Sequence, residues 1–205
     1  MMTAPRKQMS DSQKLQRLRI FCAVELPPEA REQVAAHIAQ LREAAETSLK
    51  ISWERTEKLH LTLKFLGDID ETQVEALTRA VRRATEGVGE FAVTLQEAGA
   101  FPPRGKARVL WLGLQDETGS LAQLHERLEA ECARENFARE ARPFRPHITI
   151  ARIRIPSEAA RRLAQSHANI KFEPVNFTVT EIVVMHSQLG AGGSRYTPLS
   201  KHNLK

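Results

Sequence analysis

Several features that mark other protein classes are scarce in this 205-residue chain. Its two cysteines, Cys22 and Cys132, lie far apart and lack CxxC spacing, so neither a disulfide framework nor a zinc site is indicated. No run of about 18 apolar residues is present, so no membrane-spanning segment is predicted. Residues 1–18 lack the apolar core of a secretory signal. Together with reduced thiols, these absences predict a cytoplasmic protein.

The sequence also lacks a GxxxxGK[ST] phosphate-binding loop, so it gives no sign of ATP dependence. The net charge is +5 with a pI near 9.5, a mild excess that favours an anionic partner. Positive charge is concentrated between Arg139 and Arg154, where five arginines stand against one acid, Glu140. This run is interpreted either as a solvated basic surface or as a patch that attracts phosphate.

Apolar periodicity predicts an alternation of strands and helices along the chain. Strands are expected at residues 19–26, 51–54, 59–66, 91–98, 107–114, 147–152, 175–188 and 194–199. Helices are expected at residues 28–45, 71–86, 119–135 and 156–167. The predicted organisation is a flexible basic tail over residues 1–18, one bilobal domain over residues 19–199 and a short tail over residues 200–205.

Two segments, residues 60–63 and 147–150, repeat the pattern His-x-Thr-x with an apolar residue at each x. On a strand, this alternation places His60 and Thr62, or His147 and Thr149, on one face and the apolar residues on the other. The order strand, helix, motif strand, helix occurs twice, which indicates a cryptic duplication. Two similar lobes about a pseudo-twofold axis would bring the motif strands face to face. The alternative is that each histidine is a satisfied strand residue and each threonine a strand former.

The residues around both motifs resemble a known family. Over residues 19–199 the chain is similar to the bacterial RNA 2′,3′-cyclic phosphodiesterases, also called 2′-5′ RNA ligases, of the two-histidine (2H) phosphoesterase superfamily. The segments that carry the resemblance are RIFCAVELP, HLTLKFLG, ARVLWLG, FRPHITIAR and SRYTPL. The resemblance implies an α+β fold that is bilobal and pseudo-symmetric, with two antiparallel sheets lining a central cleft and helices outside.

The resemblance also implies a reaction, with no metal and no cofactor. The family hydrolyses a 2′,3′-cyclic phosphate at an RNA end to a 2′-phosphate, and some members join RNA ends through a 2′-5′ bond. It implies that His60 is the proton donor and His147 the proton acceptor, an order that the residues alone leave open. Thr62 and Thr149 are expected to donate hydrogen bonds to the non-bridging phosphoryl oxygens.

Arg152 lies five residues after His147, so a regular strand would place it on the opposite face. A bend or strand end after Ile150 is therefore required if Arg152 is to help. The family pattern His-x-Thr-x-x-Arg implies that Arg152 contacts phosphate, and the alternative is a rim arginine. Arg108, at the start of another strand, is a further candidate for substrate contact.

Stacking of an RNA base requires an aromatic surface. Three aromatic residues near the predicted motif strands are candidates for substrate binding or for the core: Phe21, Phe144 and Tyr196. The expected partners are RNA ends or nucleotides that carry a 2′,3′-cyclic phosphate, and we expect a monomer. Two alternatives remain: a phosphodiesterase for another cyclic or 2′-5′ nucleotide, and an RNA-end binding module without turnover.

Overall fold

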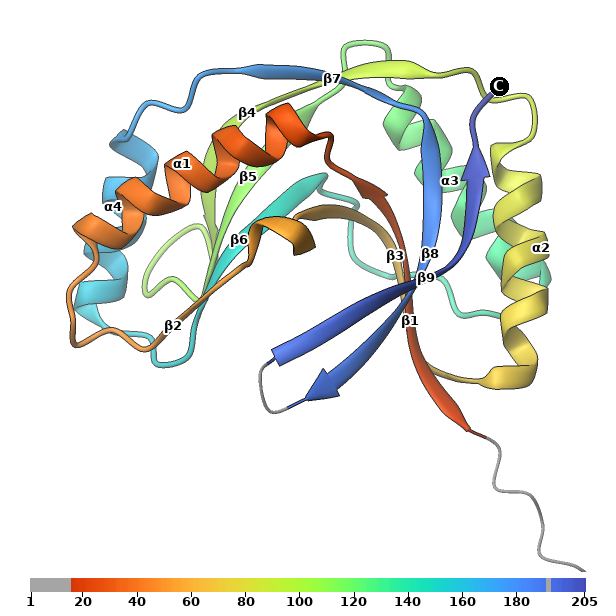
Figure 1. Cartoon of the computed structure of the whole chain (residues 1–205), viewed down its shortest axis with the longest axis horizontal. Helices are drawn as coiled ribbons and strands as arrows, with labels where there is room; N and C mark the ends of the chain where they lie inside the picture. The colour runs from red at the N-terminus through yellow and green to blue at the C-terminus, as the bar shows by residue number, and fades with distance from the viewer. Residues whose placement is uncertain (1–15, 191–192) are drawn as a thin grey trace, which may run out of the picture.

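The computed structural model describes residues 16–190 and 193–205, so most of the predicted basic tail lies outside the described residues. The chain forms an α+β fold with a strongly curled antiparallel sheet (Figure 1). The strands are β1 (Arg17–Glu25), β2 (Ile51–Trp53), β3 (His60–Asp70), β4 (Phe91–Phe101), β5 (Val109–Gln115), β6 (His147–Ile153), β7 (Val175–Val179), β8 (Glu181–Gly190) and β9 (Gly193–Asn203). The helices are α1 (Pro28–Ala44), α2 (Val74–Thr85), α3 (Ser120–Arg134) and α4 (Glu158–Asn169), with short 3-10 turns η1 (Thr56–Lys58) and η2 (Glu71–Gln73).

All strands belong to one sheet, in the order β7-β4-β5-β6-β3-β1-β8-β9, with β2 paired to β6. The prediction of two separate sheets is therefore corrected to one. The two halves of the sheet, β7-β4-β5-β6 and β3-β1-β8-β9, meet where β3 pairs with β6 through Leu61 and Ile148. This contact joins two strand edges whose backbone groups would otherwise lack partners.

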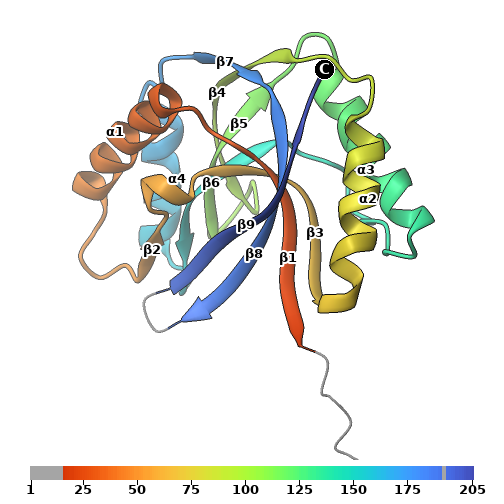
Figure 2. The same cartoon turned by 45° about the vertical axis from the view of Figure 1, so that its right-hand side comes forward.

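The helices lie in two pairs on opposite sides of the molecule, α1 with α4 and α2 with α3 (Figures 1 and 2). Each pair combines a helix from either half of the sequence. Helix α1 follows β1 but packs against α4 and β7, whereas α3 follows β5 but packs against α2 and β3. The apolar stripe Val34, Ile38 and Leu41 is buried on α1, as its helical spacing predicts. Within the described ranges, no helix has both the length and the apolar character needed to cross a membrane.

Two predicted boundaries differ from the structure. Residues 175–188, expected as one strand, form β7 and β8, which separate at Thr180 and pair with β4 and β1 in different halves of the sheet. The apolar alternation of Val175, Phe177 and Val179 stops at the polar pair Thr180 and Glu181, but no glycine or proline marks the crossing. Residues 200–205, expected as a tail, continue β9 to Asn203 and bury Leu204, whose N–H donates to the Thr180 carbonyl at 2.7 Å.

Candidate active site

A cleft of about 770 Å³ opens over the junction between β3 and β6. All four motif residues line it: His60, Thr62, His147 and Thr149. The alternating residues Leu61 and Ile148 are fully buried in the core beneath the sheet. Because the strands are antiparallel, His60 lies toward Thr149 and Thr62 lies toward His147. The two His-x-Thr motifs are therefore side by side on neighbouring strands, in one cavity.

Both catalytic candidates are oriented by the backbone in the same way. The Nδ1–H of His60 donates to the carbonyl of Lys58 at 2.6 Å, and the Nδ1–H of His147 donates to the carbonyl of Arg145 at 2.6 Å. In each case the acceptor lies two residues before the histidine. These bonds fix the tautomer and leave Nε2 as the atom available for proton transfer. The hydroxyl of Thr62 lies 3.1 Å from His60 Nε2 and donates to it when the ring is neutral.

Aromatic rings pack against both imidazoles. Phe21 and Tyr196 lie 4.9 and 5.4 Å from His60 between ring centroids. On the other side, Phe101 lies 5.2 Å from His147, and Trp111 lies 6.1 Å away. Phe21 on β1 and Trp111 on β5 come from strands that pair with β3 and β6, whereas Phe101 on β4 and Tyr196 on β9 come from strands farther along the sheet.

Burial lowers the pKa of both histidines below the ordinary imidazole value of 6.5, because the charged form loses hydration. The guanidinium of Arg152 lowers both pKa values further. Two further charges act on His60 and not on His147, and one of them, the charge of His147 itself, lowers the pKa of His60. The carboxylate of Glu25, opposite His60 in the register of β1 with β3, raises the pKa of His60, which favours a proton on that ring.

Arg152 reaches the cleft because β6 contains a β-bulge. In the pairing of β5 with β6, Trp111 faces Thr149 and Leu110 faces Ala151, so Ile150 is the extra residue. Ile150 and Ala151 are both buried, and the alternation restarts with Arg152 on the cleft side. The bend after Ile150, without which Arg152 could not help at the site, is therefore present. The Nε of Arg152 lies 3.8 Å from the carboxylate of Glu54.

Strand β3 has a bulge at the matching position. Its pairing with β1 skips Leu63, and both Leu63 and Lys64 are buried. Phe65, five residues after His60, therefore occupies the position that Arg152 occupies in β6. Its side chain lines the cleft and is 48% exposed, and the guanidinium carbon of Arg19 lies 4.6 Å from its ring centroid. The sequence prediction missed Phe65, although the same five-residue spacing in both motifs could have identified it.

The structure separates the other predicted substrate contacts. Tyr196 lines the cleft, and Phe21 lines its floor with 4% of its surface exposed. Phe144 is not part of the lining, because its ring stacks on His125 at 4.0 Å. Arg108 is also outside the lining. Among the predicted aromatic residues, Tyr196 is therefore the accessible ring in the cleft. Phe65 adds a second exposed ring.

The charge of the cleft is mainly positive. Among its described lining residues, Glu54 is the one carboxylate, and five side chains are cationic: Arg19, Arg55, Lys58, Arg152 and Arg154. The arginines between Arg139 and Arg154 therefore lie in different surroundings. Arg152 and Arg154 line the cleft, whereas Arg139 and Arg142 form ion pairs with Glu126 and Glu140. In the described part of the chain, no three His, Cys, Asp or Glu side chains gather as a metal site would require.

Known proteins resemble this chain in sequence over most of its length. The family model of the 2′-5′ RNA ligase superfamily matches residues 26–191. The chain belongs to this superfamily. A Thermotoga maritima protein named RNA 2′,3′-cyclic phosphodiesterase is 30% identical over 182 residues, covering 89% of this chain and 93% of that protein. The Escherichia coli K12 protein of the same name is 33% identical over 187 residues, covering 89% and 94%.

Two solved structures have the same fold. The protein TT0787 of Thermus thermophilus matches with a TM-score of 0.74 at 26% identity, covering 91% of this chain and 98% of that one. Escherichia coli LigT, in its complex with 3′-AMP, matches with a TM-score of 0.71 at 31% identity, covering 93% and 99%. The relatives across most of the chain are thus RNA 2′,3′-cyclic phosphodiesterases, which confirms the predicted resemblance.

Proposed function

We propose that this protein hydrolyses a 2′,3′-cyclic phosphate at an RNA end to a 2′-phosphomonoester, with His60 as general acid and His147 as general base. One observation carries the proposal: both imidazoles line one cleft, and each has its Nδ1–H bound to a backbone carbonyl. Each ring therefore has Nε2 available for proton transfer. Two imidazoles in opposite protonation states supply the acid and the base that this hydrolysis requires.

The reaction is balanced by one proton at each ring. His147 Nε2 takes a proton from water as the water oxygen attacks phosphorus. The bond from phosphorus to the ribose 3′ oxygen breaks, and His60 Nε2 gives its proton to that oxygen. Glu25 supports this order, because its carboxylate raises the pKa of His60. A ribose with a free 3′-hydroxyl and a 2′-phosphate results.

Negative charge grows on the non-bridging oxygens in the transition state. Thr62 and Thr149 line the cleft beside the two histidines, one from each half of the sheet, and each hydroxyl can donate to one of these oxygens. Arg152, brought to the cleft by the bulge, adds a guanidinium suited to phosphate. The exposed ring of Phe65 and the ring of Tyr196 offer surfaces for the terminal base.

The direct test uses an RNA oligonucleotide ending in a 2′,3′-cyclic phosphate, incubated with the protein in the presence of EDTA. The expected product is the 2′-phosphate, identified by mass and by its resistance to 3′-specific phosphatase. His60→Ala and His147→Ala should each abolish turnover, with His202→Ala as the control, since His202 hydrogen bonds to Ser200 and lies outside the cleft lining. Full activity in both cleft variants would contradict the proposal.

Two further outcomes decide between related functions. Binding of the oligonucleotide without any product would support an RNA-end binding module. A second reaction that contains an acceptor strand with a free 5′-hydroxyl tests the reverse chemistry, in which that hydroxyl replaces water. A joined product whose new linkage resists ribonuclease cleavage at 3′-5′ bonds would show 2′-5′ ligation.

A further inference from the structure

The chain approaches His147 through residues 138–146, which have no regular secondary structure. This stretch is called the 138–146 segment below. Its last part supplies the carbonyl of Arg145, which accepts the Nδ1–H of His147 at 2.6 Å. The orientation of the proposed general base therefore depends on how firmly an irregular segment is held.

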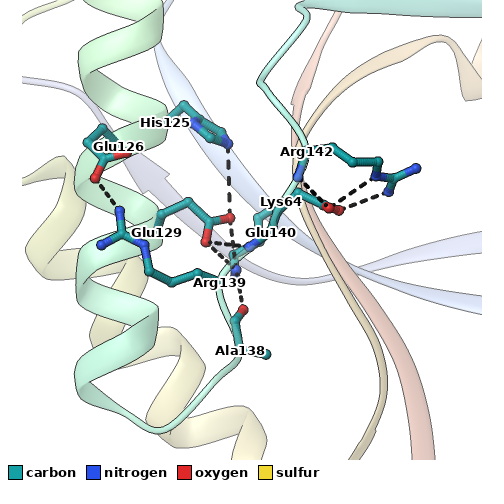
Figure 3. Close-up of polar contacts among 8 residues, drawn as sticks. All are labelled: Lys64, His125, Glu126, Glu129, Ala138, Arg139, Glu140 and Arg142. Atoms are coloured by element: carbon teal, nitrogen blue, oxygen red, sulfur yellow. Dashed lines mark hydrogen bonds and ion pairs between the residues drawn. The ribbon is translucent and has the colours of Figure 1, made fainter.

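A buried ion pair holds the start of this segment (Figure 3). Lys64 Nζ donates to both carboxylate oxygens of Glu129, at 2.8 and 2.7 Å, and the two side chains are 1% and 3% exposed. The same Nζ donates to the carbonyl of Ala138 at 2.8 Å. The carboxylate of Glu129 also accepts the N–H of Glu140 at 3.1 Å. Each charged partner thus binds one backbone group of the segment.

The other end of the segment is fixed by different contacts. Phe144 stacks on the His125 ring at a centroid distance of 4.0 Å and an angle of 10°. The carbonyl of Pro146 accepts the N–H of Leu114 at 3.1 Å. His125 and Glu129 lie one turn apart on α3, and His125 Nε2 is 3.9 Å from the Glu129 carboxylate. Helix α3 therefore contacts both ends of the 138–146 segment.

This cluster also connects the two motif strands. Lys64 lies two residues after Thr62 on β3, and the segment leads directly to His147 on β6. Strand β3 pairs with β6 at Leu61 and Ile148. We propose that Lys64 and Glu129 are positioning residues that fix the 138–146 segment against β3 and so orient the imidazole of His147. This inference rests on the proposed function, because it assigns the pair a role in the same reaction.

Stability alone does not explain such a pair. Burying two charges costs hydration, and replacing a buried ion pair with apolar residues of similar volume is often neutral or stabilising. The double variant Lys64→Met/Glu129→Leu keeps β3 and α3 packed while it removes both backbone contacts to the segment. It therefore separates packing from positioning, which neither single variant can do, since each leaves one buried charge unpaired.

The experiment measures steady-state hydrolysis of the cyclic-phosphate oligonucleotide, thermal unfolding and the imidazole ¹⁵N spectrum of the double variant. We expect kcat to fall by about 10- to 100-fold, with KM changed less than about twofold and with folding retained. The His147 ring signals should change from one tautomer to a mixture, while those of His60 stay as in the wild type. Arg83→Met is the control, because Arg83 bonds to Glu131 on α3 and to Glu135, the residue after its end, without touching the segment.

A folded double variant with unchanged kcat and an unchanged His147 tautomer would overturn the inference. If that variant does not fold, Lys64→Met/Glu129→Gln decides, because it leaves no buried charge and keeps an acceptor for the N–H of Glu140, while the carbonyl of Ala138 still loses Lys64. A lowered kcat with shifted His147 ring signals supports the positioning role, and wild-type values for both overturn it. Failure of the proposed function is recognised separately: the wild type would then have no activity, while the ring signals would still report the orientation of His147.

Discussion

At the scale of single residues, the two histidines have the same backbone contact and different electrostatic surroundings. Lys58 and Arg145 supply equivalent carbonyls, so the tautomers match. Glu25 acts on the pKa of His60, and no carboxylate contributes to the lowered pKa of His147 among the causes that shift it. The carboxylate that favours a proton on His60 thus comes from a neighbour on β1 and not from the motifs themselves.

The pH dependence of kcat/KM should follow from these pKa values. The base must be neutral, so the rate rises as pH passes upward through the pKa of His147. The acid must be protonated, so the rate falls as pH passes upward through the pKa of His60. Since burial lowers both pKa values, the maximum should lie on the acid side of 6.5. Rate measurements from about pH 4 to 9 check this, and a rate that only rises with pH would contradict it.

Replacing Glu25 with Gln isolates its contribution. Glu25 raises the pKa of His60, so Glu25→Gln should move the basic limb of the profile to lower pH. The acidic limb, set by His147, should stay in place. A parallel shift of both limbs would show that Glu25 acts on the whole cleft and would argue against the assignment of the acid to His60.

Arg152 is expected to contribute charge and geometry together. Arg152→Ala should reduce kcat/KM by about 10²- to 10³-fold, the usual cost of losing a donor to transition-state charge. Arg152→Lys should recover part of this loss, because an ammonium keeps the charge but not the paired donors. Arg154→Ala, which changes another arginine of the cleft lining, is the comparison. Equal effects of the two alanine variants would reduce Arg152 to a general contribution to positive charge.

At the scale of secondary-structure elements, two bulges shape the site. Without the extra residues Leu63 and Ile150, alternation would turn Phe65 and Arg152 away from the cleft. The bulge in β6 was required by the function expected of Arg152, and it was found. The bulge in β3 was not predicted, because nothing in Leu63 or Lys64 distinguishes a bulged strand from a regular one.

Strand β4 supports the His147 side of the cleft through a glycine. A Cβ on Gly99 would lie 2.2 Å from the indole of Trp111, the ring beside His147. Gly99→Ala should therefore displace Trp111, lower the free energy of unfolding by about 1–3 kcal/mol and reduce kcat. Gly89→Ala, where nothing lies within 4 Å of the new Cβ, is the control. Denaturant unfolding and activity assays measure both effects; equal behaviour of the two variants would exclude a role for this packing.

The sequence predicted the features that depend on neighbouring residues, and it did not predict those that depend on contacts between distant strands. Alternation predicted the motif strands and placed His60, Thr62, His147 and Thr149 on one face, because that rule is local. The crossing at Thr180 and the joining of both sheet halves depend on distant strands. Phe144 was predicted near the substrate because it lies close to His147 in sequence, but its stack on His125 turns it away from the cleft.

At the scale of the whole molecule, the exchange of helices ties both halves of the sequence together. Helix α1 covers strands of the second half, and α3 packs against α2 and β3 of the first. Each half of the sequence therefore depends on a helix from the other half to cover part of its strands. The predicted duplication is visible in the order of the elements, but it does not divide the folded chain into independent units.

Unfolding should accordingly be one cooperative transition. Trp53 on β2 and Trp111 on β5 both lie in the half of the sheet that contains β6, so tryptophan fluorescence reports that half. Far-ultraviolet circular dichroism reports all the helices and strands. The two midpoints in urea should coincide. Separate midpoints would show that the half with both tryptophans unfolds by itself and would contradict the structural role of helix exchange.

The pairing of β3 with β6 at Leu61 and Ile148 has a thermodynamic consequence for the bound state. An anion held by Thr62 and Thr149 together would act as a non-covalent cross-link over the narrowest connection in the sheet. Anion binding and stability would then be thermodynamically linked, because each increment of occupancy adds to the free energy of unfolding. A titration with a 2′-phosphorylated nucleotide should raise the melting temperature progressively, and Thr62→Val/Thr149→Val should flatten that response.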